Sequence, residues 1–256
     1  MKLLILIGLV LFAVTAGATP WERSSDQRTH LPEKLARGSK DWNFDWGLGY
    51  TQYSGNIEST NANTEFTYFR KCGDDSFYIN SGFMYGLSKD VVTQNQGRLA
   101  LRYDWPVNET FKWFAFNTHA YNEFLKLYYR GTVGAGPWYD FLGEDWKNGI
   151  SIAPAYFHET FKGFGTEKEL WISLRNVFNY KISDTASFGF DSFFMFRSND
   201  PEDQLTFLQP YLETVIKPDK FSLKLSYLYE GDTRPKPGVK STDSTYMATL
   251  MLHFGE

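Results

Sequence analysis

Residues 42–50 read WNFDWGLGY, and this stretch decides the fold. Trp, Phe, Trp, Leu and Tyr occupy every second position, and the positions between them carry Asn, Asp and Gly. Successive side chains of a β-strand point to opposite faces, so this period of two predicts a strand with one apolar and one polar face. Residues 221–229 and 243–254 repeat the pattern.

The same alternation recurs in nine further segments, which are separated by short polar clusters such as 71–75 and 217–220. A strand that spans a membrane as part of a barrel needs about 9–11 residues, and bacterial barrels have an even number of strands. We therefore predict an all-β, antiparallel transmembrane barrel of the outer-membrane type, with about twelve strands. The predicted strands lie near 42–50, 59–71, 76–87, 91–105, 111–122, 126–141, 149–161, 168–181, 186–197, 203–216, 221–229 and 243–254.

A soluble β-sandwich is the alternative with the same period, but its strands are usually only about 5–6 residues long. Connections after the even-numbered segments are compact, whereas Glu230–Thr242 and Lys162–Lys168 are longer and polar. Short turns at one end and longer loops at the other are typical of outer-membrane barrels. Aromatic residues at strand ends are expected to form girdles at the two membrane interfaces: Trp42, Trp105, Trp138, Tyr180, Phe221 and Phe254.

Composition excludes several other classes of protein. The 256 residues are 18% aromatic and 42% apolar, with one Cys and a net charge of -4. The aromatic content excludes disorder, and a mean hydropathy of -0.40 excludes a bundle of membrane-spanning helices. One Cys excludes a disulfide framework and a Cys-built metal site, and the negative charge argues against nucleic-acid binding. No metal, nucleotide or haem signature is present, so no cofactor is expected.

The N-terminus has the pattern of a secretory signal peptide. Lys2 precedes an apolar run from Leu3 to Val14, and small residues follow at a cleavage site of the A-x-A type. We predict a signal peptide over 1–18, a polar segment over 19–41 and the barrel over 42–254. The polar segment is either a periplasmic tail or a plug that folds into the barrel.

Several short motifs resemble one known family. They are WGLGYTQYSGN at 46–56, NANT at 61–64, RLALRYD at 98–104, WFAF at 113–116 and LYYRGTVGAG at 127–136. In their order and spacing the chain resembles the YdiY-like family of bacterial outer-membrane proteins. That family has no defined function, and its members carry the label salt-induced outer membrane protein. The resemblance implies an outer-membrane β-barrel and no particular activity.

Placing the apolar face of each strand toward lipid places a set of charged residues toward the interior. Arg or Lys on the lipid face would cost about 2–4 kcal/mol at the membrane midplane, so the interior is favoured. These charges either line a narrow passive pore for small polar solutes or neutralise one another in a closed, structural barrel. The predicted lumen-lining residues are Asp45, Glu65, Arg98, Arg102, Arg130, Glu159, Arg175, Asp191, Glu213 and Lys224.

The alternative function is an outer-membrane lipid hydrolase of the phospholipase or lipid A deacylase type. Such an enzyme needs a base within hydrogen-bond reach of a hydroxyl group and a third group that orients the base. The available residues are His119, His158, Ser151, Thr160 and Glu159, and no His-x-Ser pair occurs. We therefore expect no catalytic site.

The expected partners follow from an outer-membrane location in a Gram-negative bacterium. They are outer-membrane lipid and lipopolysaccharide, together with the periplasmic chaperone and barrel-assembly machinery; no nucleic acid is expected. The polar loop 231–242 carries Arg234, Lys236 and Lys240, which could contact anionic lipopolysaccharide or simply be solvated. The sequence assigns neither a solute nor an oligomeric state.

Overall fold

The structure, a computed structural model, describes most of the chain after residue 41. The described residues are 42–54, 59–88, 91–123, 126–217, 220–235, 237 and 240–254. The predicted signal peptide (1–18) and polar segment (19–41) lie outside these residues and stay predictions. No helix within the described ranges is long and apolar enough to cross a membrane.

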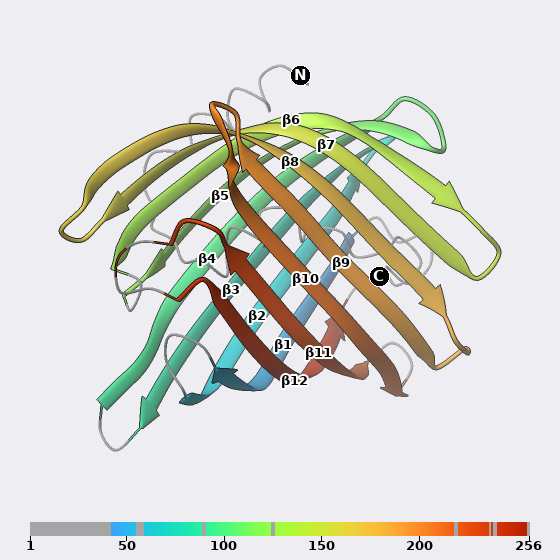
Figure 1. Ribbon diagram of the computed structural model, residues 1–256. Helices are drawn as coiled ribbons and strands as arrows, with labels where there is room; N and C mark the ends of the chain where they lie inside the picture. Colours follow the sequence, from blue (N-terminus) through green and yellow to red (C-terminus); the bar gives the residue numbers. More distant parts are fainter. Residues whose placement is uncertain are drawn as a thin grey trace.

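Twelve antiparallel strands form one closed barrel (Figure 1), which confirms the predicted fold. Each strand pairs with its neighbours in sequence, and β1 pairs with β12 to close the barrel. The strands are 12 to 18 residues long, enough to span a membrane of about 30 Å. They are β1 (Trp42–Ser54), β2 (Ser59–Cys72), β3 (Asp75–Ser88), β4 (Val91–Pro106), β5 (Phe111–Asn122), β6 (Leu127–Leu142), β7 (Trp146–Phe161), β8 (Gly165–Lys181), β9 (Ala186–Arg197), β10 (Asp200–Lys217), β11 (Phe221–Asp232) and β12 (Thr242–Phe254).

The two ends of the barrel carry different sets of connections. In Figure 1 the turn between β6 and β7 lies at the right and the turn between β7 and β8 at the left. We call the end with the turns after even-numbered strands, where β12 finishes, the C-terminal end, and the other end the loop end. The connection 233–241 at the loop end is the longest between two strands. The predicted long connection Lys162–Lys168 is wrong, because β8 already begins at Gly165, where a positive φ of 82° completes a tight turn.

The barrel wall has one buried and one exposed face, as the period of two predicts. Trp46 and Leu48 are 41% and 45% exposed, whereas Asp45 between neighbouring apolar residues is 6% exposed. Hydrogen bonds between strands satisfy the backbone, so a closed barrel leaves no open sheet edge in the membrane. The exposed apolar face is the surface that lipid covers.

The interior is not uniformly polar. Thirteen buried apolar residues pack together along the inner wall from β5 to β12, a cluster that the alternating sequence pattern does not predict. Both faces of β5 and β9 carry large apolar residues, so the period of two does not show which of them point inward. The cluster comprises Phe114, Phe116, Trp138, Ala153, Ala155, Phe157, Trp171, Phe193, Met195, Leu205, Phe207, Leu228 and Met247.

Trp138 corrects one part of the predicted aromatic girdle. It is 2% exposed and faces the interior, where its Nε1 donates a hydrogen bond of 2.8 Å to Asp140. Its ring lies over Gly149, where an added Cβ would come within 2.0 Å of the indole. Glycine is therefore required at position 149, which pairs with Asp140, for this close approach of the Trp138 ring. Trp42, Tyr180 and Phe254 are exposed on the outer face, as predicted.

Candidate functional site: the barrel interior

A chain of alternating charges follows the inner wall near the C-terminal end. Arg102 Nε donates to Asp104 Oδ1 at 2.5 Å, and Lys112 Nζ lies 3.4 Å from Asp104 Oδ2. Lys112 also lies 3.5 Å from Asp140 Oδ2, which Lys147 approaches at 3.2 Å. These five residues, Arg102, Asp104, Lys112, Asp140 and Lys147, are called the inner network. Asp104 and Lys112 flank the turn 107–110, and Asp140 and Lys147 flank the turn 143–145, so four neighbouring strands build it.

Aromatic rings from the apolar cluster enclose the inner network. The guanidinium carbon of Arg102 lies 4.2 Å from the centre of the Phe114 ring and 5.0 Å from that of Trp138. Lys112 Nζ lies 5.6 Å from the Trp138 ring. A cation over an aromatic face gains roughly 0.5–2 kcal/mol, more when water is excluded. The rings therefore help to hold the buried cations in place.

Three further ion pairs connect other parts of the wall. Arg175 on β8 holds Asp191 on β9 with two hydrogen bonds, one of them the 2.9 Å contact from Nε to Oδ1. Arg98 Nη2 lies 3.3 Å from Glu65 Oε2, and Arg130 pairs with Glu159. Arg175 also interacts electrostatically with Arg102 and Asp104.

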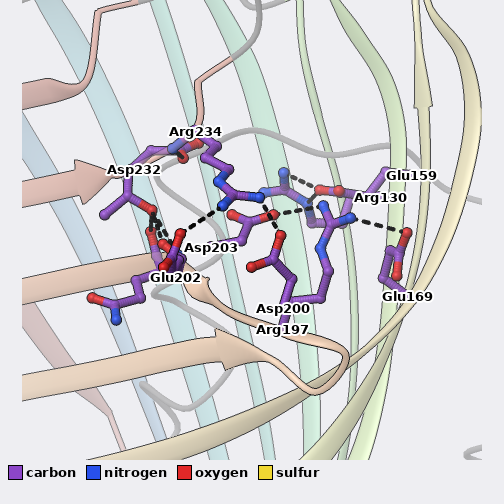
Figure 2. Close-up of polar contacts among 11 residues, drawn as sticks. Arg130, Glu159, Glu169, Arg197, Asp200, Glu202, Asp203, Asp232 and Arg234 are labelled. Carbon is purple, nitrogen blue, oxygen red and sulfur yellow. Dashed lines mark hydrogen bonds and ion pairs between the residues drawn. The ribbon is translucent and has the colours of Figure 1, made fainter.

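The loop end carries a second group of charges, which we call the outer cluster (Figure 2). Arg197 Nη2 lies 2.7 Å from Asp203 and its Nη1 lies 3.2 Å from Glu169. Figure 2 shows Arg234 reaching across to Asp200 and Glu202. Three arginines thus face six carboxylates in the outer cluster, which comprises Arg130, Glu159, Glu169, Arg197, Asp200, Glu202, Asp203, Asp232 and Arg234.

A hydrogen-bonded chain crosses the seam where the barrel closes. His253 Nδ1 lies 2.5 Å from Asp45 Oδ1, and Nε2 lies 2.8 Å from Ser222 Oγ. Ser222 donates its own hydrogen bond of 2.5 Å to Glu213. The single hydroxyl proton of Ser222 is donated to Glu213 rather than to His253, so this carboxylate–histidine–serine arrangement lacks the serine-to-histidine hydrogen bond of a catalytic triad.

All ten predicted lumen residues lie on the inner face of the wall, where their side chains are buried or partly buried. Six of them pair with each other as Glu65–Arg98, Arg130–Glu159 and Arg175–Asp191. The other four take partners outside the predicted set: Arg102 takes Asp104, Asp45 takes His253, Glu213 takes Ser222, and Lys224 Nζ lies 5.0 Å from the Tyr211 ring.

The predicted lumen set lacks five charged residues that lie next to the turns. The inner-network partners Asp104, Lys112, Asp140 and Lys147 share the inward parity of their strands, and so does Asp203. Charged residues at strand ends resemble the solvated residues of polar turns, so the sequence alone does not mark them as interior residues. Four of the five already lie within the predicted segments 91–105, 111–122, 126–141 and 203–216, and Lys147 lies two residues before 149–161, so following the parity to the segment ends and slightly beyond would find all five.

The residues considered for a lipid hydrolase do not come together. Ser151 and Glu159 are buried on the inner face of β7, whereas His158 and Thr160 alternate with them on the outer face. His119 also faces outward, and the Tyr129 ring lies between the two histidines. Opposite faces of one sheet cannot form a single site, so these residues offer no hydrolase centre.

The described part of the chain holds no group of three or more His, Cys, Asp or Glu residues that could bind a metal ion. At the C-terminal end, Lys181 Nζ donates a hydrogen bond of 2.5 Å to Asp184 in the turn after β8. This hydrogen bond and the lysine charge lower the pKa of the Asp184 carboxyl group.

Comparison with known sequences identifies a family. Residues 46–254 match the family described as "Protein of unknown function, DUF481", which covers nearly the whole barrel. The chain belongs to this family. The match is consistent with the YdiY-like resemblance of the sequence motifs, and the family description assigns no activity. No curated protein sequence matches the chain.

Solved structures with a similar fold are outer-membrane porins and channels. A NanC porin superposes with a TM-score of 0.58 at 11% identity, covering 81% of this chain and 98% of its own. An outer membrane channel from Pseudomonas putida F1 gives a TM-score of 0.54 at 9% identity, with 84% and 96% of the two chains covered. At these identities the likeness shows the fold: this DUF481 member is an outer-membrane type β-barrel.

Proposed function

We propose that this DUF481 member is a narrow, passive pore for small polar solutes in the outer membrane of a Gram-negative bacterium, and that it has a transport role rather than a catalytic one. The loop end faces outward in this proposal, because outer-membrane barrels have short periplasmic turns and longer external loops. The position of the 233–241 connection supports this orientation.

The observation that carries the proposal is that buried guanidinium groups have N–H donors without a hydrogen-bond partner. Nη1 of Arg102 and Nη1 of Arg175 have no hydrogen-bond partner among the described residues, although the two side chains are 0% and 1% exposed. Leaving a buried donor unsatisfied costs about 1–3 kcal/mol. A barrel with a purely structural interior would avoid that cost with apolar side chains. Unsatisfied N–H donors beside ion pairs instead favour an interior that is in contact with water or a polar solute.

Single-channel conductance in planar bilayers tests the proposal. Mature protein starting at Thr19 is refolded, and its heat-modifiable gel mobility shows that the barrel has formed. We expect discrete conductance steps that increase with salt concentration. Folded protein that never conducts would contradict the pore and leave a closed structural barrel as the function.

Two matched variants connect the conductance to the interior. Arg98→Gln and Asp191→Asn each remove one interior charge, and Lys181→Gln removes an exposed charge at the C-terminal rim as the control. We expect the first two to change conductance or ion selectivity in opposite directions and the control to leave both nearly unchanged. Conductance steps that respond to none of the three would belong to a contaminant or to a path outside the barrel interior.

A further inference from the structure

Three lysines gather at the loop end on neighbouring turns and strands. The backbone N–H of Lys162 donates a hydrogen bond of 2.5 Å to the carbonyl of Lys126, so the turns after β5 and β7 touch. Lys168 on β8 lies opposite His158 in the β7–β8 register. All three lysines are exposed, and none forms an ion pair with a described residue. We call Lys126, Lys162 and Lys168 the basic rim.

The basic rim belongs to the lipid-facing side of the wall. Even-numbered residues of β7 and β8 point away from the interior, as the exposure of Tyr156 (44%) and Leu170 (45%) shows. His158 and Lys168 share this parity. Thr160 and Thr166 do so as well, with their hydroxyl oxygens 3.2 Å apart. The rim thus combines ammonium groups with hydroxyl donors just above the apolar outer surface.

Exposed aromatic rings lie beneath two of these lysines. Lys162 Nζ lies 5.9 Å from the Tyr128 ring, and Lys126 Nζ lies 5.8 Å from the Phe164 ring. Tyr128 is 60% exposed and Phe164 is 44% exposed. Aromatic residues with nearby lysines are typical of the headgroup level of a membrane. This places the rim at the height of lipid phosphate groups.

A buried histidine without a partner on Nε2 lies on the same outer face. His119 is 2% exposed, and its Nε2 has no hydrogen-bond partner among the described residues. Its ring lies 6.3 Å from that of Tyr129, which meets the His158 ring edge-on at 5.6 Å. Burying a polar nitrogen without a partner is unfavourable unless a ligand satisfies it. This outward nitrogen is a second sign of a polar ligand at the loop end.

An apolar groove crosses the outer wall from β5 to β11, closer to the middle of the membrane than the rim. It has a volume of 680 Å³, and Ile152, Leu174 and Phe194 are among the outward-facing side chains that line it. Leu174 follows Lys168 by six residues on β8, which is roughly 20 Å at about 3.3 Å per residue. A molecule with an anionic head and an apolar tail matches this sequence of surfaces.

We propose that the outer face of β5–β8 binds one phosphorylated glycolipid of the lipopolysaccharide type. Its phosphate groups contact the basic rim, its sugar hydroxyls reach Thr160 and Thr166, and one acyl chain lies in the groove. Lysine binds phosphate as a compact point charge, and two lysine-bearing turns suit a headgroup with more than one phosphate. The site rests on the proposed outward orientation of the loop end but not on whether the barrel conducts.

The polar loop 231–242, the other region expected to contact lipopolysaccharide, is a weaker candidate in the structure. Arg234 in the 233–241 connection is held by Asp200 and Glu202, so its charge is already compensated. Lys236 lies outside the described residues. The basic rim therefore offers the stronger attraction for an anionic headgroup.

A binding experiment with charge variants tests the proposal. The rim variant is Lys126→Ser, Lys162→Ser and Lys168→Ser; the control is Lys71→Ser, Lys217→Ser and Lys220→Ser, three exposed lysines elsewhere on the barrel. Refolded proteins in detergent are titrated with bisphosphorylated lipid A and observed by native mass spectrometry. We expect binding to the rim variant to be roughly tenfold weaker or more, since each lysine near an anionic lipid surface contributes to attraction. The control should bind like the wild type.

The lipid itself provides the remaining arms of the experiment. Lipid A without its phosphates should bind more weakly to the wild type and equally to the rim variant. Equal binding of both lipid A forms to the wild type, or an unaffected rim variant, would overturn the proposal. Phosphatidylglycerol binding as tightly as lipid A would assign the site to phospholipid and overturn the glycolipid. Ser192→Phe, which fills the groove, should weaken binding of lipid A but not of its deacylated, phosphorylated disaccharide.

Discussion

The inner network and the outer cluster use the same residue types in different surroundings. At the C-terminal end, the Arg102 and Asp104 side chains are 0% and 3% exposed. At the loop end, the Arg130–Glu159 pair is buried too, but the Arg234 side chain is 48% exposed and that of its partner Glu202 is 87% exposed. The balance of charge differs too, because the inner network has three cations and two carboxylates, and the outer cluster has three cations and six carboxylates.

This difference indicates that charged residues have two roles in the barrel, one in stability and one in attracting ions. A buried ion pair costs desolvation energy and becomes strongly destabilising when one partner is removed. An exposed pair contributes little to stability, yet its field acts on ions at the entrance. We therefore expect the inner network to control stability and the exposed charges of the outer cluster to control which solutes enter.

The largest expected effect is on the inner network. Arg102→Ala removes the guanidinium partner of Asp104 and takes a cation away from the Phe114 and Trp138 rings. We expect the free energy of unfolding to fall by about 3–5 kcal/mol, the usual cost of breaking a buried pair. Urea titration of the barrel in detergent, followed by tryptophan fluorescence, measures the change.

A double variant sharpens this test. Arg102→Met with Asp104→Leu replaces both partners by apolar groups, which often restores stability. We expect the double variant to be more stable than Arg102→Ala. If Arg102→Ala alone costs less than about 1 kcal/mol, the pair behaves as an exposed one, and the comparison fails.

Packing around the inner network predicts a smaller effect. Gly149→Val places side-chain atoms where the Trp138 ring now lies, since even a Cβ would approach it to 2.0 Å. Forcing an extra group into a packed interior costs about 1–3 kcal/mol, and the hydrogen bond from Trp138 to Asp140 should lengthen or break. The same urea titration detects the loss.

Gly231→Ala is the matched control for this change. Its added Cβ would meet its nearest neighbour at 3.4 Å, an ordinary contact distance. We expect little change in the unfolding free energy. Equal effects of the two substitutions would show that glycine in these strands is required for the backbone rather than for the contact with Trp138.

How far the sequence predicts the two regions depends on where each residue lies along its strand. In the middle of strands the period of two distinguishes Asp45, Arg98 and Arg175 from their apolar neighbours, so these positions were predictable. Trp138 was assigned to the wrong face, because β6 has glycines at Gly131, Gly134 and Gly136 and lacks a clear apolar parity. Hydrophobicity alone cannot orient such a strand; the inward direction follows from the partners Asp140 and Arg102.

Pairing between side chains is a second limit. The ion pair Arg175–Asp191 joins neighbouring strands, but sequence gives no register between them. Chains such as Asp45–His253–Ser222 join the first strand to the last two, and only barrel closure brings them together. The outer cluster likewise depends on Arg234, which lies just past the end of β11 and reaches Asp200 at the start of β10.

The outer cluster should determine ion selectivity if the barrel conducts. Its excess of carboxylates predicts a preference for cations. Asp200→Asn with Glu202→Gln removes two negative charges and releases Arg234. An exposed charge at contact distance is worth about 1 kcal/mol in water, so the cation-to-anion permeability ratio should fall roughly fivefold. Reversal potentials in a potassium chloride gradient give this ratio.

The control for selectivity is Asp184→Asn, which removes an exposed carboxylate at the C-terminal end. We expect a weaker effect there, because that charge is already compensated by Lys181. A larger shift from Asp184 than from the loop-end pair would place the selective entrance at the C-terminal end.

The smallest expected effect is on stability at the outer cluster. Arg234→Ala removes two ion pairs, but its side chain is half exposed and both partners remain in contact with water. Exposed pairs contribute about 0–1 kcal/mol, and salt screens them. We expect a loss of unfolding free energy below about 1 kcal/mol that disappears at high salt. A loss comparable to that of Arg102→Ala would mean that Arg234 fastens the 233–241 connection to β10 and that burial does not separate the two regions.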